Sequence, residues 1–274
     1  MLDNVNINEK DPNGNTLLHH VAIREENPKF ITELVNAKCD INAKSNSGDT
    51  PLHLAASQGH AKNIETLLRL GANPYITNVT GQTPLHLASQ EGKTNAVEAL
   101  LRNPELRELV DKADEKHNNT ALHHAAINGH KDTVKFLIDS GADIDAVDKK
   151  GNTALHLAVI FDQVDTLKTL LESKADPNLQ NIHGDTPLHI AILKNNKESV
   201  RVLINEKANV NIRNKEGQTA TFLMECAISQ INLIKDIIYS LPAGKPQGRL
   251  ANAPGNEGPR AAQLVGSGVP HQRS

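Results

Sequence analysis

Residues 45–77 read SNSGDTPLHLAASQGHAKNIETLLRLGANPYIT, and this stretch decides the fold. It opens with a turn in which Gly48 can adopt a positive φ. Thr50 is a good N-cap, and Pro51 suits the first helical position, where its missing N–H costs nothing. We therefore expect a short helix to begin at Pro51.

The same stretch predicts two short helices. Apolar residues at helical spacing define the first one: Leu52, Ala55 and Ala56. Gly59 ends it, and a second helix carries Ile64, Leu67 and Leu68 on one face. Gly71 stands where a left-handed C-cap belongs. Such a unit is too small to bury its own apolar face, so copies of it must stack to bury a continuous core.

The unit recurs along most of the chain. The string T-x-L-H occurs six times, with its threonines at Thr16, Thr50, Thr83, Thr120, Thr153 and Thr186. A seventh copy at Thr219 keeps only the Thr and the preceding Gly217. Successive threonines are 34, 33, 37, 33, 33 and 33 residues apart. A nearly constant period of this length indicates stacked repeats that form a solenoid.

The period and the T-P-L-H-x-A signature resemble the ankyrin repeat family over about residues 2–240. The resemblance implies an all-α solenoid of helix-turn-helix units with β-hairpin-like finger loops, followed by a disordered C-terminal tail. Residues 1–10 are then an N-terminal cap or the remnant of a preceding repeat. The array spans residues 11–240, in units of about 11–44, 45–77, 78–114, 115–147, 148–180, 181–213 and 214–240. Residues 241–274 form the tail.

Several units depart from the pattern. The third unit has four extra residues in or near RNPELRELVDKAD, which we expect to lengthen its second helix or its finger. Asn118 replaces the turn glycine of the fourth unit, and Asn is the next best residue at positive φ. In the seventh unit Thr221 and Phe222 replace Leu and His, as suits a degenerate terminal cap.

Composition argues against several classes of protein. The net charge of -3 gives no general attraction to nucleic acid or to an anionic membrane. No stretch approaches the roughly 18 apolar residues that a membrane-spanning helix needs. Cys39 and Cys226 are lone cysteines, which favours a reducing, cytoplasmic compartment. The tail is rich in Gly and Pro and lacks a helical period, so it is expected to be a linker, a short binding segment or sequence foreign to the array.

The tripeptide GKT at residues 92–94 matches the end of a phosphate-binding loop. The full motif needs a glycine five residues before Gly92, but Leu87 stands there. Gly92 also takes the slot of Gly59, between the two helices of a unit. We therefore expect an inter-helix turn and no nucleotide cofactor.

Six of the 13 histidines are the fourth residue of the repeat motif: His19, His53, His86, His123, His156 and His189. We expect their imidazoles to hydrogen-bond one unit's turn to its neighbour. Because they recur about one repeat apart, they predict a ladder rather than a cluster around a metal ion. No Ser–His–Asp or Cys–His arrangement stands out, so we expect neither a metal site nor catalysis.

The family's architecture implies a concave face made by the finger tips and the ends of the first helices. In units four to six the corresponding slots contain apolar and basic residues: Ile127, Ile160, Phe161, Leu193, Ile182, His183, Lys116, His117, Lys149, Lys150 and Lys194. An apolar centre with a charged rim is how protein interfaces are organised. The patch predicts a protein partner that presents a segment with acidic residues beside apolar ones.

The sequence therefore predicts a monomeric scaffold that binds a partner protein. Two alternatives remain open: an effector of an intracellular bacterium that acts in the host-cell cytoplasm, or a regulatory or targeting fragment of a larger enzyme. The family's fingers often end in an Asn that is a target of asparaginyl hydroxylation, and the resemblance places Asn42, Asn178 and Asn211 in that slot.

Overall fold

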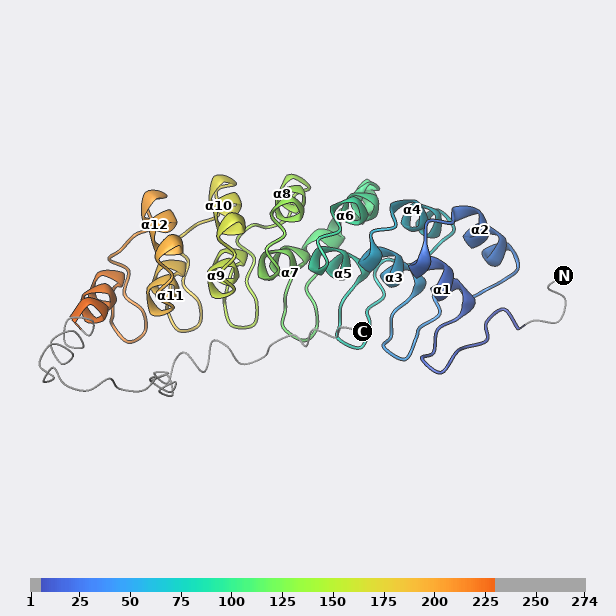
Figure 1. Ribbon diagram of the computed structural model, residues 1–274, viewed down its shortest axis with the longest axis horizontal. Coiled ribbons are helices and arrows are strands. Elements are labelled where there is room, and N and C mark those ends of the chain that lie inside the picture. Colours follow the sequence, from blue (N-terminus) through green and yellow to red (C-terminus); the bar gives the residue numbers. More distant parts are fainter. Residues whose placement is uncertain (1–5, 230–274) are drawn as a thin grey trace, which may run out of the picture.

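The structure is a computed structural model that describes residues 6–229 of the 274-residue chain. The described helices form two rows, with the finger loops projecting from one side (Figure 1). The row of first helices consists of α1 (Leu17–Arg24), α3 (Pro51–Gln58), α5 (Pro84–Gln90), α7 (Ala121–Ile127), α9 (Ala154–Ile160) and α11 (Pro187–Leu193). The row of second helices consists of α2 (Pro28–Asn36), α4 (Ala61–Arg69), α6 (Thr94–Leu101), α8 (Lys131–Asp139), α10 (Val164–Glu172) and α12 (Lys197–Asn205). The predicted solenoid is confirmed.

The first helices begin at the motif threonines, as the sequence of residues 45–77 predicts for its own unit. The N-caps of the first helices are the motif threonines, all in extended conformation, and proline follows in α3, α5 and α11. Gly59 and Gly129 adopt φ values of 84° and 76° in the turn that follows the first helix. Asp162 and Asn195 occupy the same turn in later units with φ values of 58° and 54°. Their side chains therefore carry a conformational cost that glycine avoids.

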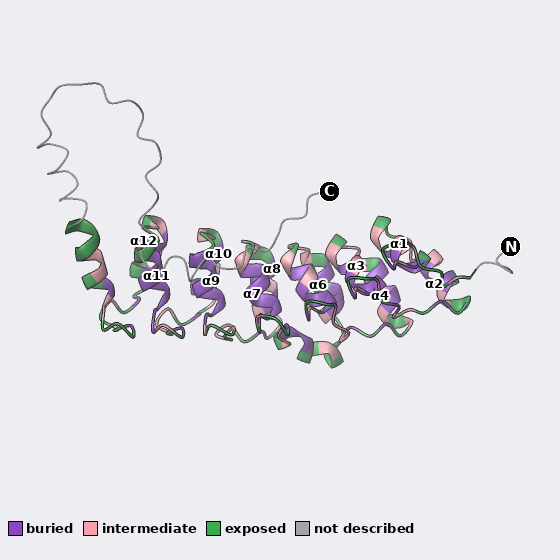
Figure 2. Cartoon of the chain, turned by 90° about the horizontal axis from the view of Figure 1, so that it is seen from below, coloured by how far each residue is buried: buried purple, intermediate pink, exposed green. Residues whose placement is uncertain are grey.

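The core runs from α1 to α11 because every pair of neighbouring first helices packs together. Small residues make this close approach possible: Ala22, Ala55, Ala88, Ala125, Ala158 and Ala191 are each fully buried. A leucine in each of the first six units, such as Leu52 or Leu155, is also fully buried. Buried residues follow the helices, whereas the finger loops are largely exposed (Figure 2). No unit has a core of its own, so stability depends on stacking.

The extra residues of the third unit form a separate element. Helix α6 has 8 residues against 9 in α4, so the expected longer second helix is wrong. Instead, Asn103 caps a 3-10 helix, η1 (Pro104–Asp111), whose Leu109 and Val110 are buried. The finger also gains a residue, as expected, because six positions separate Asp114 from Thr120 and five separate Asn78 from Thr83.

The two ends of the described region differ from the inner units. Asn8 Oδ1 accepts the N–H of Asp40 at 2.8 Å, which joins residues before the first helix to the loop after α2. At the other end, Arg213 and Thr219 form an isolated antiparallel bridge, and residues 220–229 are helical and mostly exposed. Within residues 6–229 the fingers otherwise contain turns rather than strands. The predicted disordered tail lies outside the described residues, and the unit boundaries stay a prediction.

Candidate protein-binding face

The motif histidines form a ladder that fixes the spacing of the units. Nδ1 of His156 accepts the N–H of Thr153 at 3.2 Å and lies 2.9 Å from the Thr153 hydroxyl. Its Nε2 lies 3.1 Å from the carbonyl oxygen of Asp185, which precedes the next motif threonine. The same contacts recur at His19, His53, His86, His123 and His189. The expected link between neighbouring turns is confirmed.

These contacts require a neutral imidazole. A carbonyl oxygen can only accept, so Nε2 carries the proton, and Nδ1 must stay unprotonated to accept an N–H. Burial accordingly lowers the pKa of His156 to about 4. Burial lowers the pKa of His86 to about 3, with a further contribution from the neighbouring His124. The ladder is a structural device, and within residues 6–229 no three potential metal ligands cluster.

A second histidine strengthens the first and fourth units. His124 Nε2 lies 2.9 Å from Asp114 Oδ2, and both side chains are buried. Burial raises the pKa of Asp114, but hydrogen bonds from His124 and from the N–H of His117 outweigh it and lower that pKa to about 2. His20 makes the corresponding contact with Asp11 in the first unit. The pair anchors the longer fourth finger to helix α7.

Backbone hydrogen bonds join the tips of fingers four to seven, in which the later tip donates to the preceding one. Lys149 N–H donates to His117 O at 2.9 Å, Ile182 N–H donates to Lys150 O at 2.9 Å, and Lys215 N–H donates to His183 O at 3.0 Å. Fingers four to seven are therefore one connected surface. We call the surface made by the finger tips and the C-terminal ends of the first helices the finger face. Its fingers are held in place before any partner arrives, which lowers the entropy cost of binding.

The predicted apolar residues divide into exposed and buried groups. Phe161, Leu193 and Ile182 are 43%, 43% and 48% exposed. Ile127 is half-buried and packs against the core. Ile160 is only 9% exposed and belongs to the core, so it offers little surface to a partner. Phe161 is the C-cap of α9 in unit five, and Leu193 is the last residue of α11 in unit six, so the exposed group is centred on these two units.

The predicted cations also divide. Lys149 Nζ donates to the carbonyl oxygens of Glu115 and Lys116 at 2.6 and 2.9 Å, so it ties two fingers together. Lys194 Nζ lies 3.9 Å from Asp162 Oδ2. The side chains of Lys116 and Lys150 are exposed and make no ion pair with any residue of 6–229. These two lysines are therefore the cations most available to a partner.

Sequence reasoning missed Val147, which lies at the base of the fifth finger and is 47% exposed. The same slot holds Lys10, Lys44, Thr77, Ala113, Gln180 and Arg213 in the other units. The signal for it was a large apolar side chain in a slot that holds polar residues or the small Ala113 in the other units. Val147 is an exposed apolar side chain two residues before Lys149 in the fifth finger.

The predicted hydroxylation slot has a structural role. Oδ1 of Asn42 accepts the N–H of Asn73 at 2.9 Å, and Oδ1 of Asn178 accepts the N–H of Asn209 at 2.7 Å. Asn211 N–H instead donates to Asn209 Oδ1 at 3.0 Å. The first two side chains therefore tie one loop to the next. Hydroxylation at any of the three stays a prediction.

The GKT tripeptide lies in an inter-helix turn, as expected. Gly92 has a φ of 63°, and Lys93 is the N-cap of α6. A Cβ on Gly92 would lie 2.5 Å from the imidazole of His130, so the ring of the next unit occupies the space beside this turn. Among residues 6–229 no helix is long and apolar enough to cross a membrane.

Comparisons with known proteins agree with this architecture. A family model described as "Ankyrin repeats (3 copies)" matches residues 1–78, 20–108, 64–148, 103–181 and 173–241. The chain therefore belongs to the ankyrin repeat family.

Among solved structures, the ankyrin repeat domain of Bcl-3, described as a member of the IkappaB protein family, superimposes with a TM-score of 0.71 at 30% identity. That match covers 77% of this chain and 94% of the Bcl-3 domain. The ankyrin repeat domain of human ASB11 gives a TM-score of 0.65 at 27% identity, covering 79% and 97% of the two chains.

Curated relatives match over shorter stretches. Human NF-kappa-B inhibitor alpha is 34% identical over 127 residues, which is 46% of this chain and 30% of that protein. The tankyrase poly [ADP-ribose] polymerase of Caenorhabditis elegans is 38% identical over 63 residues, 23% of this chain and 3% of that enzyme. The chain thus matches less than half the length of these curated relatives.

Proposed function

We propose that the chain is a protein-binding scaffold whose finger face in units four to six docks a partner protein. The observation that carries the proposal is the exposed group of Phe161, Leu193 and Ile182 on consecutive units. Large apolar side chains gathered on one face of a folded array are typical of an interaction surface. Aromatic residues near the centre of such a surface are favoured hot spots.

The charges suggest what the partner carries. Lys116 and Lys150 have no ion pair within the described residues, and they lie on the fourth and fifth fingers, which hydrogen bonds connect to the finger of Ile182. A partner segment with carboxylates beside an apolar side chain would pair with these lysines and pack against the exposed apolar group. Complementary charge of this kind favours specificity and the rate of association more than final affinity. The proposed location is the cytosol, in agreement with the two free cysteines, Cys39 and Cys226.

The relatives support a role in binding rather than catalysis. One of them is by name an inhibitor of NF-kappa-B, and we propose that this chain likewise acts through contact with another protein. The matches to the poly [ADP-ribose] polymerase tankyrase and to a probable serine/threonine-protein kinase of Dictyostelium discoideum cover 3% and 9% of those proteins. These small shares favour a second candidate function: the array is the targeting part of a longer protein.

The test is affinity capture from a cell lysate with mass spectrometry. The wild-type chain is compared with the double variant Phe161→Glu, Leu193→Glu, whose two sites are exposed and therefore tolerate polar substitution. The matched control is Val79→Glu, because Val79 is 73% exposed on the third finger, away from units four to six. Circular dichroism first checks that all three chains are folded.

The proposal predicts a partner that is retained by the wild type and by the control but lost from the double variant. Retention of the same partners by all three chains would refute the finger-face assignment. Loss from the control alone would move the binding surface to the N-terminal units.

A further inference from the structure

The backbone hydrogen bonds between finger tips are interrupted at one place in the array. In the first three fingers, Asn46 N–H donates to Asn13 O at 2.9 Å. Val79 N–H donates to Ser47 O at 3.0 Å, and fingers four to seven are joined in the same way. Between finger three and finger four, no backbone hydrogen bond links any two of residues 6–229. The fingers therefore form two bonded blocks: a first block of fingers one to three and a second block of fingers four to seven.

The loops that lead into the fingers are interrupted at the same junction. In five of these loops, a side-chain oxygen accepts a backbone N–H of the next loop. The acceptors and donors are Asn8 and Asp40, Asn42 and Asn73, Asp111 and Asp143, Asp145 and Asp176, and Asn178 and Asn209. Tyr75 takes this position before finger three, and within the described residues its side chain makes no such bond. Instead, Lys112 Nζ donates to Tyr75 O at 3.2 Å and lies 5.6 Å from the centre of its ring.

The extra residue of finger four accounts for the missing tip bond. In finger three, Gly81 N–H donates to Asn78 O, three residues back, at 3.0 Å. In finger four, Asn118 N–H donates to Asp114 O, four residues back, at 3.1 Å, so the turn is wider. A Cβ on Gly81 would lie 2.5 Å from the nitrogen of Glu115, so the two fingers touch. They are in contact, but the wider turn leaves them without the bond that joins the other tips.

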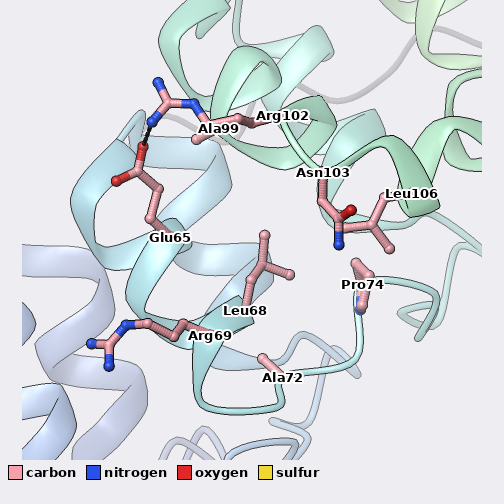
Figure 3. Close-up of a pocket in the computed structure, with 9 residues that line it drawn as sticks. All are labelled: Glu65, Leu68, Arg69, Ala72, Pro74, Ala99, Arg102, Asn103 and Leu106. Carbon is pink, nitrogen blue, oxygen red and sulfur yellow. Dashed lines mark hydrogen bonds and ion pairs between the residues drawn. The ribbon is translucent and has the colours of Figure 1, made fainter.

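On the outer row, η1 connects the two blocks and has open space on one side. It borders a hollow of about 490 Å³ that is lined by Leu106 of η1 and Leu68 of α4 (Figure 3). Its other side is anchored, because Leu109 and Val110 are buried. The hydrogen-bond geometry of a 3-10 helix is also poorer than that of an α-helix. The segment between units three and four can therefore shift toward the hollow.

The helices stay packed across this junction. Helix α5 packs against α7, and α6 packs against α8. His86 Nε2 lies 3.0 Å from Asn119 O, and His130 Nε2 lies 2.9 Å from Gln90 O. The contacts that remain belong to the helices and the finger bases, whereas the missing bonds belong to the finger tips and the loops. A rotation about the packed helices can therefore separate the two blocks of fingers without unpacking the core.

We propose that the junction between units three and four is a hinge, about which the first block of fingers moves relative to the second. Each unit of a repeat array contacts only its neighbours, so motion concentrates at the junction with the fewest bonds between fingers. Hinges are typically a few residues in loops or at the ends of packed elements. A partner that touches both blocks selects one curvature of the array from those that the hinge allows. Phe161, Leu193 and Ile182 all lie in the second block, so the hinge does not depend on their role in binding.

The test is double electron–electron resonance on the full chain, with spin labels on pairs of exposed finger tips that are two fingers apart. Exposed Cys226 is first replaced by Ser, and buried Cys39 is left in place. The pair Val79→Cys, Lys150→Cys spans the junction, whereas Asn13→Cys, Val79→Cys lies within the first block and Lys116→Cys, Ile182→Cys within the second. Each pair is also measured with Lys112→Ala, which removes the lysine bond at the junction. The matched control is Lys44→Ala, because Lys44 Nζ donates to Thr77 O at 2.9 Å inside the first block.

We expect the distance distribution of the pair across the junction to be about twice as wide as those of the two pairs within a block. Lys112→Ala should widen the distribution across the junction further and leave the other two unchanged. Lys44→Ala should change none of the three, because the tip and loop bonds of the first block remain. Equal widths for the three pairs would overturn the proposal, as would an equal widening by Lys44→Ala within the first block. Circular dichroism of every labelled chain checks that the array is folded.

Discussion

Acidification is expected to destabilise the array through its buried histidine ladder. Folded His156 must keep Nδ1 unprotonated to accept the N–H of Thr153. The unfolded chain has no such constraint, and its histidines take up a proton near the ordinary pKa of 6.5. Because burial lowers the folded pKa, the stability is fully present above 6.5 and is lost as the pH falls toward the folded value.

The magnitude follows from the pKa values. One unit of pKa difference corresponds to about 1.4 kcal/mol. Between about pH 7 and about pH 5, a histidine that protonates only in the unfolded state lowers the free energy of unfolding by about 2 kcal/mol. His86 and His156, whose pKa values are lowered to about 3 and about 4, both meet this condition and together account for about 4 kcal/mol. Burial also lowers the pKa values of His19, His53 and His123, which adds to the effect in the same direction.

The assay is urea unfolding followed by far-UV circular dichroism at both pH values. The wild type is compared with His156→Gln, which keeps an amide donor and cannot titrate. The variant is less stable at neutral pH, but its loss on acidification should be smaller than that of the wild type by about 2 kcal/mol. Equal stability of the wild type at the two pH values would refute the reasoning, as would an equal pH-dependent loss in the variant.

Three further outcomes are expected. Lys174 has a φ of 75° in the slot where Gly141 has a φ of 97°. In urea unfolding, Lys174→Gly should therefore stabilise the array by about 1 kcal/mol, and Gly141→Lys should destabilise it by a similar amount. A loss of stability in Lys174→Gly would contradict this. Leu155 is fully buried, so Leu155→Ala should lower the free energy of unfolding by about 2–5 kcal/mol. Val147 is exposed, so Val147→Ala should change it by no more than about 0.5 kcal/mol. Similar values for the two variants would show that the core assignment is wrong. ATP with Mg²⁺ should leave the melting temperature unchanged, because Gly92 belongs to an inter-helix turn, and a reproducible rise would restore the phosphate-loop reading.

The local features of each unit could be predicted from the sequence because they depend on neighbouring residues. Thr50, Pro51 and Gly59 mark the start and end of α3, and the structure places the helix between them. The role of the motif histidines was also predictable, since their period equals the repeat length. The residues that start and end a helix lie within one unit, and the motif histidines recur at the same position in successive units, so the sequence alone shows both.

Features that depend on packing between units could not be predicted in the same way. Ile160 and Leu193 share a slot, yet one is 9% and the other 43% exposed, because their neighbours differ. Lys149 looked like a free cation, but its Nζ reaches two carbonyl oxygens of the preceding finger. The 3-10 helix η1 arises where the chain must fit extra residues between two stacked units, and the period alone does not show what shape they take.

The central claim is that the finger face of units four to six contacts a partner protein. Hydrogen–deuterium exchange of the chain, alone and in complex with the captured partner, tests it most directly. The account predicts slower exchange on binding around residues 115–119, 148–152 and 181–185 and at the ends of α9 and α11. Slower exchange confined to the N-terminal fingers, or to α4 and η1 on the outer row, would contradict it.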